Sequence, residues 1–209
     1  MLFETIVVGP LGVNCFILGD KQSKEGMVVD PGADCDIILA TVAQFGIKVK
    51  YIINTHGHFD HMGCNRRLKE KTGAPLLAHK EDLNFLVHAS RSATKYGLTV
   101  EDSPEPDLFL TDGMQLQLGA RVIEVLHTPG HTQGGCCLYL ANEKLVLTGD
   151  TLFADSVGRT DLPGGNHDQL IISIRTKLMA LPDDTIVWPG HGPSSTIGQE
   201  RRFNPYLND

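Results

Sequence analysis

The sequence predicts an α/β fold, because two successive runs of strand patterns are each followed by helical patterns. Apolar residues make up 41% of the 209 residues and charged residues 21%, which is typical of a globular protein with a sizeable core. Two packed sheets flanked by helices would satisfy this order, and so would one doubly wound sheet. The pattern of segments alone leaves both architectures open.

The first half of the chain begins with strands and then alternates helices with strands. Short apolar runs between Gly and Asp residues predict strands over 3–8, 13–18, 27–30, 49–54 and 76–78. Apolar residues at helical spacing predict a helix over 34–45 that stops at Gly46. Further helices are expected over 61–71, ending at Gly73, and over 81–88. Residues 89–111 are expected to form a surface connection.

The second half of the chain repeats this order. Strands are predicted over 114–118, 122–126, 136–140, 144–147 and 185–188, with a hairpin turn at 141–143. Leu170, Ile171, Ile174 and Leu178 lie on one face of a helix predicted over 168–179. Helices in both halves therefore have an apolar side with which to cover a sheet.

The strongest chemical signal is a short loop that contains His56, His58, Asp60 and His61. Gly57 allows the backbone a tight conformation between the first two imidazoles. The spacing differs from the i, i+4 histidine pair of a helical zinc site, so these ligands are expected on a loop. Three histidines and one aspartate within six positions indicate a metal site rather than a polar turn with incidental histidines.

Four predicted strands each lead directly into a residue that can bind metal: His56, His131, Asp150 and His191. Gly or Thr stands just before each of these residues, where it ends the strand and lets the next side chain turn outward. Strands that lie side by side would bring these four ends to one rim of the sheet, where binding residues usually lie.

The candidate ligands together are five histidines and two aspartates. Imidazole and carboxylate suit zinc, iron, manganese or nickel. Seven ligands exceed the four of a closed structural zinc site, but they fit two metals that share one carboxylate. Two metals about 3.5–4 Å apart hold a bridging hydroxide and lower the pKa of its parent water to near 7, so no separate strong base is needed.

Charge, cysteines and the N-terminal sequence exclude other classes. The net charge of −7 argues against nucleic acid as a partner, and the apolar runs are far shorter than the roughly 20 residues of a membrane helix. The first residues lack the features of a secretory signal. Five cysteines without a C-x-x-C pair predict no disulfide framework and a reducing compartment, so a cytoplasmic location is expected. Cys64 is interpreted as a buried thiol rather than a nucleophile.

Five motifs in order resemble the metallo-β-lactamase superfamily: V-D-P-G at 29–32, H-x-H-x-D-H at 56–61, P-G-H-T at 129–132, G-D-T at 149–151 and P-G-H-G at 189–192. This resemblance implies an αββα sandwich formed by a single domain over 1–209. It implies one metal on His56, His58 and His131, a second on Asp60, His61 and His191, and Asp150 as the bridge. Asp30 would either orient a ligand imidazole or serve as a turn residue before Pro31.

Within that superfamily the chain is similar to short glyoxalase II enzymes, the hydroxyacylglutathione hydrolases. We expect a short form, a single domain over 1–209 without the C-terminal helical domain with which the longer enzymes grip glutathione. The resemblance implies hydrolysis of a small-molecule thioester such as S-lactoylglutathione by attack of a metal-bound hydroxide, with Asp60 and Asp150 in the catalytic centre. Two divalent ions are expected, zinc first, with iron or manganese as alternatives.

The G-R-T-D run at 158–161 favours a second enzyme class, since it also occurs in the related mono-iron persulfide dioxygenases, which act on glutathione persulfide. Arg159 in that run is expected either to bind a substrate carboxylate or to be an ordinary surface arginine. The complete ligand set argues against a non-enzymatic member of the superfamily. The negative charge and the lack of a long inserted domain argue against a nuclease.

Overall fold

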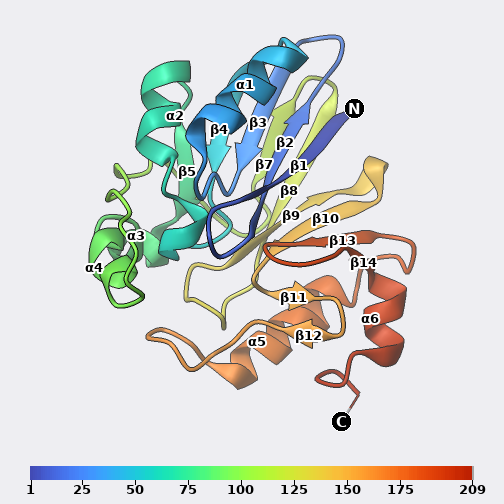
Figure 1. Ribbon diagram of the computed structural model, residues 1–209. Helices are drawn as coiled ribbons and strands as arrows, with labels where there is room; N and C mark the ends of the chain where they lie inside the picture. The colour runs from blue at the N-terminus through green and yellow to red at the C-terminus, as the bar shows by residue number, and fades with distance from the viewer. Residues whose placement is uncertain (209) are drawn as a thin grey trace.

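The computed structural model describes residues 1–208 and arranges them in four layers, helix–sheet–sheet–helix (Figure 1). Two six-stranded sheets form the central layers, with strand orders β1-β2-β3-β4-β5-β6 and β14-β13-β10-β9-β8-β7. This arrangement confirms the αββα sandwich, and it excludes the single doubly wound sheet that the segment pattern left open.

The first sheet contains six strands: β1 (Leu2–Val8), β2 (Val13–Gly19), β3 (Glu25–Val29), β4 (Lys48–Ile53), β5 (Leu76–His79) and β6 (Leu108–Leu110). The first three strands pair antiparallel, and β3 to β6 pair parallel. Parallel neighbours need a crossover, and here α1 (Cys35–Phe45) joins β3 to β4 while α2 (Asn65–Thr72) lies between β4 and β5. Figure 1 shows both helices on the outer face of this sheet.

The second sheet contains β7 (Gln115–Leu118), β8 (Arg121–His127), β9 (Cys136–Leu140), β10 (Leu145–Gly149), β13 (Ile186–Pro189) and β14 (Ser195–Thr196). Its outer face is covered by α5 (His167–Ser173), which continues as a π-helical turn over Ile174–Leu178, and by α6 (Ile197–Phe203). A small hairpin of β11 (Leu152–Phe153) and β12 (Ser156–Val157) lies nearby. None of the helices between residues 1 and 208 has the length and apolar character that crossing a membrane requires.

The main core lies between the two sheets. Phe16 and Leu18 of β2 meet Val125 and Leu138 of the second sheet there, and all four side chains are fully buried. Ile17, between the two β2 residues, points to the other face and packs in the cluster that includes helix α1. Every residue of β2 is therefore buried, which is why its sequence is a nearly continuous apolar run rather than an alternating one.

Several short elements differ from the prediction. The helix predicted over 61–71 begins only at Asn65, because the chain first makes a 3₁₀ turn over Phe59–His61 that carries two candidate ligands. The connection expected over 89–111 contains α4 (Ala89–Thr94) and β6, and it follows the short helix α3 (Leu83–Leu86). The prediction for α1 was close, since Gly46 ends this helix with a φ of 60°.

Cys64 is buried as predicted, but the prediction that it is a thiol was wrong, because its sulfur forms a disulfide. Cys64, just before α2, is bonded to Cys35 at the start of α1, with a Cα–Cα distance of 5.5 Å. The parallel packing of β3 against β4 brings the segments after these strands together, although 29 positions separate the two cysteines. The other three cysteines are free and buried.

Candidate metal centre

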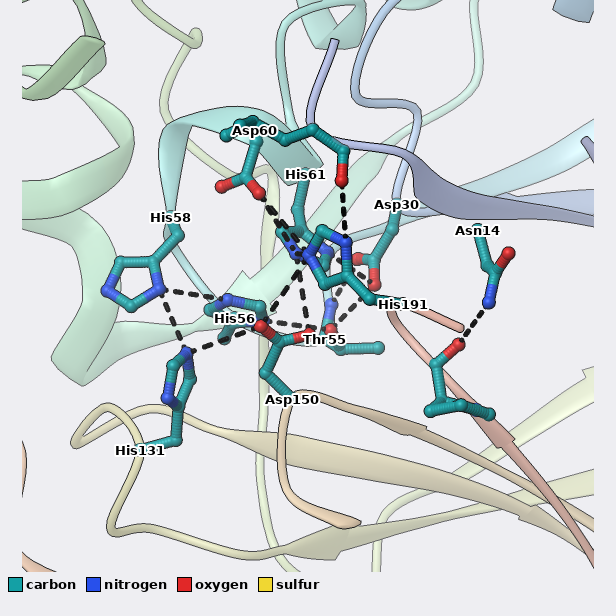
Figure 2. A network of polar contacts seen from close by, with 12 residues as sticks. Asn14, Asp30, Thr55, His56, His58, Asp60, His61, His131, Asp150 and His191 are labelled. Carbon is teal, nitrogen blue, oxygen red and sulfur yellow. Dashed lines mark hydrogen bonds and ion pairs between the residues drawn. The ribbon is translucent and has the colours of Figure 1, made fainter. Parts of the chain in front are cut away.

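The seven predicted ligands lie together at the rim where strands of both sheets end (Figure 2). His56, His58, Asp60 and His61 follow β4 of the first sheet. His131, Asp150 and His191 follow β8, β10 and β13 of the second sheet. The centre therefore spans the two sheets, and neither half of the chain forms it alone.

The first group of ligands consists of His56, His58 and His131. Nδ1 of His58 lies 3.2 Å from Nε2 of His56 and 2.9 Å from Nε2 of His131. Imidazole nitrogens bound to one tetrahedral zinc are about 3.3 Å apart, because each Zn–N bond is about 2.0–2.1 Å long. The three rings therefore converge at a spacing that suits one small cation.

The second group consists of Asp60, His61 and His191. The Nε2 atoms of the two histidines are 3.2 Å apart. Oδ2 of Asp60 lies 3.7 Å from Nε2 of His61 and 3.4 Å from Nε2 of His191. Two imidazoles and one carboxylate form a harder donor set than the three imidazoles of the first group, and they suit zinc, iron or manganese.

Asp150 lies between the two groups. Its Oδ2 is 3.7 Å from Nε2 of His131, and its Oδ1 is 3.6 Å from Nε2 of His61. Oδ1 is buried and has no hydrogen-bond partner among residues 1–208. A buried carboxylate oxygen without a donor is costly, and a cation between these donors would satisfy it. The residues present therefore fit bound metal.

Buried groups behind the ligands orient the rings. The fully buried Asp30 accepts hydrogen bonds from the backbone N–H and the hydroxyl of Thr55, both at 2.7 Å, and its Oδ2 lies 3.1 Å from Nδ1 of His61. Thr55 in turn contacts Nδ1 of His56 at 3.1 Å. Of the two roles expected for Asp30, the structure therefore shows the orienting one.

Backbone carbonyls orient two further rings. Nδ1 of His131 donates to the carbonyl of Arg159 at 2.7 Å, and Nδ1 of His191 donates to the carbonyl of Leu11 at 3.1 Å. Such bonds fix the ring tautomer, so that the opposite nitrogen of each ring would be free to bind a metal ion. Sequence reasoning missed both carbonyls, because a backbone acceptor leaves no signal in residue type.

The two groups differ in their electrostatics. Burial and the neighbouring His131 lower the pKa of His58 to about 3, and burial lowers the pKa of His56, so both of these rings favour the neutral form. In the second group burial alone would lower the pKa of His61, but the carboxylates of Asp150, Asp60 and Asp30 raise it to about 10. The carboxylate cluster thus attracts positive charge, which in the metal-free chain is a proton and which a metal ion can replace.

Asp82 is a buried acid that sequence reasoning missed. It ends the turn that follows β5, and its carboxylate accepts hydrogen bonds from the N–H groups of Gly57 and Gly134, both at 2.8 Å, and from the Thr132 hydroxyl at 2.7 Å. Burial raises the pKa of this carboxyl, and the three donors oppose that shift. In the sequence Asp82 looks like an ordinary acidic residue at the start of a helix, so only the fold reveals its partners.

A cavity of about 360 Å³ opens above the ligands. Besides ligands, its lining includes Phe85, Lys95, Tyr96, Arg159 and Leu162. The Arg159 side chain is held by Asp161 through two 2.7 Å hydrogen bonds, whereas Lys95 has no ion-pair partner within residues 1–208. The structure therefore places the predicted substrate residue Arg159 at the cavity, but with its charge already paired.

The four remaining histidines lie outside the ligand groups. The rings of His79 and His127 stack with their centroids 4.1 Å apart. His88 donates from Nδ1 to the carbonyl of Asn84, and His167 is the first residue of α5. The rings of His79, His127 and His88 therefore make contacts outside the ligand groups.

The comparisons with known proteins agree with the fold. A family model described as the metallo-beta-lactamase superfamily matches residues 8–191. An uncharacterized protein of Aquifex aeolicus is 42% identical over 209 residues, covering 100% of this chain and 98% of that protein. The hydroxyacylglutathione hydrolase GloC of Haemophilus influenzae is 38% identical over 210 residues, covering 100% of this chain and 99% of that enzyme.

Solved structures show the same fold. The BLEG-1 B3 metallo-beta-lactamase superposes with a TM-score of 0.93 at 35% identity, covering 100% of both chains. A protein solved in a di-iron-bound form superposes with a TM-score of 0.90 at 37% identity, covering 98% of this chain and 100% of that one. ETHE1 from Myxococcus xanthus superposes with a TM-score of 0.81 at 28% identity, covering 98% of this chain and 84% of that one. The chain therefore belongs to the metallo-beta-lactamase superfamily, whose fold binds metal ions.

Proposed function

We propose that the protein is a metal-dependent hydrolase of thioesters with a two-metal centre. The observation that carries this proposal is the pair of ligand groups on either side of Asp150, at the base of a cavity large enough for a small substrate. One ion would be held by His56, His58 and His131. The other would be held by Asp60, His61 and His191, and Asp150 would bind both ions. The GloC relative supports the thioester as substrate, since its name describes hydrolysis of an acylglutathione.

The metal would supply Lewis acidity and a water whose pKa is lowered to near 7. Zinc, iron and manganese all suit these ligands, and the structural relative in a di-iron-bound form supports two ions of this kind. The protein supplies a fixed geometry, because buried acceptors on other residues hold the rings of His61, His131 and His191.

The residues at the base of the cavity are suited to position a water for attack on a carbonyl. Contacts with His61 and His191 hold the pKa of Asp60 well below its usual range, although burial opposes this shift. Asp60 is therefore ionised at neutral pH already in the metal-free chain, and as a carboxylate it can accept a hydrogen bond from that water. The leaving group is a thiolate, and because free thiols have a pKa of about 8.5 it departs without a dedicated acid.

The side chains that line the cavity beside the ligands are suited to the thiol carrier of the substrate. Phe85 packs edge-on against His58 with ring centroids 5.8 Å apart, and Tyr96 packs against Phe59 at 5.5 Å, so the wall beside the ligands is apolar. Lys95 also lines the cavity, and among residues 1–208 no carboxylate pairs with its positive charge. We propose that the carrier is an anionic thiol such as glutathione, and that a carboxylate on it contacts Lys95.

A second candidate function is oxidation of a persulfide by a single iron. The observations that favour it are the similarity to ETHE1 at 28% identity and the G-R-T-D run at 158–161. Metal content and oxygen uptake distinguish the two functions, because hydrolysis uses no oxygen. Paired assays of thioester cleavage and oxygen consumption on protein of known metal content test the proposal.

A further inference from the structure

Asp82 joins the two loops that carry the first group of ligands. One loop holds His56 and His58, with Gly57 between them, and the other runs from His131 to Gly134. Oδ2 of Asp82 accepts from the Gly57 N–H and the Thr132 hydroxyl, and Oδ1 accepts from the Gly134 N–H. One fully buried carboxylate thus connects the loop at Gly57, 25 positions before it, to the loop at Gly134, 52 positions after it.

The packing around Asp82 leaves no room for a side chain at Gly57 or Gly134. A Cβ atom added at Gly57 would lie 2.9 Å from Cβ of Asp82, and one added at Gly134 would lie 2.6 Å from its Cγ. Both loops therefore use glycine where the carboxylate approaches the backbone, which is a role for which only glycine has space. The contact depends on residue types in three separate segments.

His58 depends most on this contact. The rings of His56 and His131 are each oriented through Nδ1, by Thr55 and by the Arg159 carbonyl. His58 presents Nδ1 to the other two ligands, and its second ring nitrogen has no hydrogen-bond partner within residues 1–208. Its position is therefore determined by its backbone, which Asp82 holds through Gly57, and by its packing against Phe85.

We infer that Asp82 is a positioning residue for the first metal, the one on His56, His58 and His131. It acts on the main chain of the two ligand loops and does not touch the metal. Asp30 acts differently, since it contacts the ring of His61 directly and that of His56 through Thr55. Loss of Asp82 should therefore weaken the first metal and spare the second.

Asparagine is the sharpest substitution because it keeps the shape and removes one acceptor. In Asp82→Asn the amide nitrogen must face either the Gly57 N–H or the Gly134 N–H, and that buried donor then has no acceptor. Groups behind metal ligands typically change metal affinity by about 10–100-fold. Glu200→Gln is the matched control, because Glu200 is also fully buried and accepts from three donors, on Asp155, Ser195 and Asn204, away from the ligand loops.

The test measures the affinity for zinc by competition with a chromophoric chelator, in two backgrounds that each retain one ligand group. In His191→Ala, which keeps the first group, Asp82→Asn should lower the affinity about 10–100-fold. In His131→Ala, which keeps the second group, Asp82→Asn should change the zinc affinity less than about twofold. Glu200→Gln should have no effect on the zinc affinity in either background. If Asp82→Asn does not fold, Thr132→Val removes one donor and should produce a smaller loss in the His191→Ala background only.

If Asp82→Asn lowers the zinc affinity equally in both backgrounds, Asp82 has a general structural role and the inference is overturned. The inference is also overturned if Asp82→Asn leaves the zinc affinity unchanged in the His191→Ala background. The inference rests on the proposed two-metal centre, but the two fail separately. Zinc content of the unsubstituted chain tests the centre, while the comparison of backgrounds tests Asp82 without any measurement of turnover.

Discussion

Asp30 and His61 form a fully buried pair in which Oδ2 of the carboxylate lies 3.1 Å from Nδ1 of the imidazole. Asp30 follows directly after β3 and has a φ of 51°, in the left-handed region that few residues other than glycine adopt. Such strained positions occur where the surrounding structure requires a particular side-chain direction. Here the direction brings the carboxylate to the ring that carries a proposed metal ligand.

Replacement of Asp30 by asparagine should weaken the second metal. The asparagine amide offers one acceptor oxygen in place of two, so either the Thr55 N–H or the His61 ring loses its partner. Zinc affinity measured in the His131→Ala background should fall by about 10–100-fold. Asp34→Asn is the control, because Asp34 also has a left-handed φ and accepts a backbone N–H, but from Gly9 on the surface. An affinity unchanged by Asp30→Asn would contradict the role assigned to this pair.

Lys95 should contribute more to binding of an anionic thioester than Arg159 does. Asp161 already pairs with Arg159, whereas Lys95 has no such partner within residues 1–208. Lys95→Met should raise KM several-fold for an acylglutathione with little change in kcat, as expected when a group binds substrate and transition state equally. The effect should shrink at high ionic strength. Lys71→Met on α2, outside the cavity, is the control, and a larger effect of Arg159→Met would reverse the assignment.

The stability of the protein should fall in mild acid through His79. Burial lowers the pKa of His79 to about 4, the stacked His127 adds to the shift, and Nδ1 accepts the Glu81 N–H at 3.3 Å. The unfolded chain has a histidine pKa of about 6.5, so it binds more protons than the folded chain between pH 6.5 and 4. The contribution of His79 to the free energy of unfolding is therefore complete above pH 6.5 and is lost as the pH falls from 6.5 to 4.

His79→Asn tests this, because its side-chain oxygen replaces the acceptor without titrating. The unfolding free energy of the variant, measured by urea denaturation of metal-free protein, should decline less between pH 6.5 and 4 than that of the unsubstituted chain. Parallel curves for the two proteins would show that His79 does not carry this dependence.

The Cys35–Cys64 disulfide should stabilise the fold against unfolding. Closing a loop of 29 positions restricts the unfolded chain by about 3–4 kcal/mol in the chain-entropy description. Addition of a reductant should therefore lower the urea midpoint of the unsubstituted protein. The same reductant should leave the Cys35→Ser/Cys64→Ser variant unchanged, and an equal shift in that variant would show that the reductant acts elsewhere.

The ligands could be predicted because each stands in a short local pattern. A strand, a Gly or Thr, and then His or Asp is visible in the sequence at His131, Asp150 and His191. The αββα order followed from the family motifs, since alternating strands and helices alone do not separate one sheet from two.

Features that depend on distant contacts could not be predicted. Asp82 lies 25 and 52 positions from the glycines it contacts, and its own sequence resembles a helix start. The disulfide depends on the pairing of β3 with β4, which the spacing of the cysteines does not reveal. Short elements such as β6 and α4 have too few residues to show a period.

Metal content measured together with turnover tests the central claim most directly. Purified protein should contain near two ions per chain and cleave S-lactoylglutathione without oxygen uptake. His58→Ala should lose metal from the first group and reduce turnover by roughly 100-fold or more, because a direct ligand matters at least as much as the groups behind it. One iron per chain with oxygen consumed on a persulfide, or full thioester turnover by His58→Ala, would contradict the proposed centre.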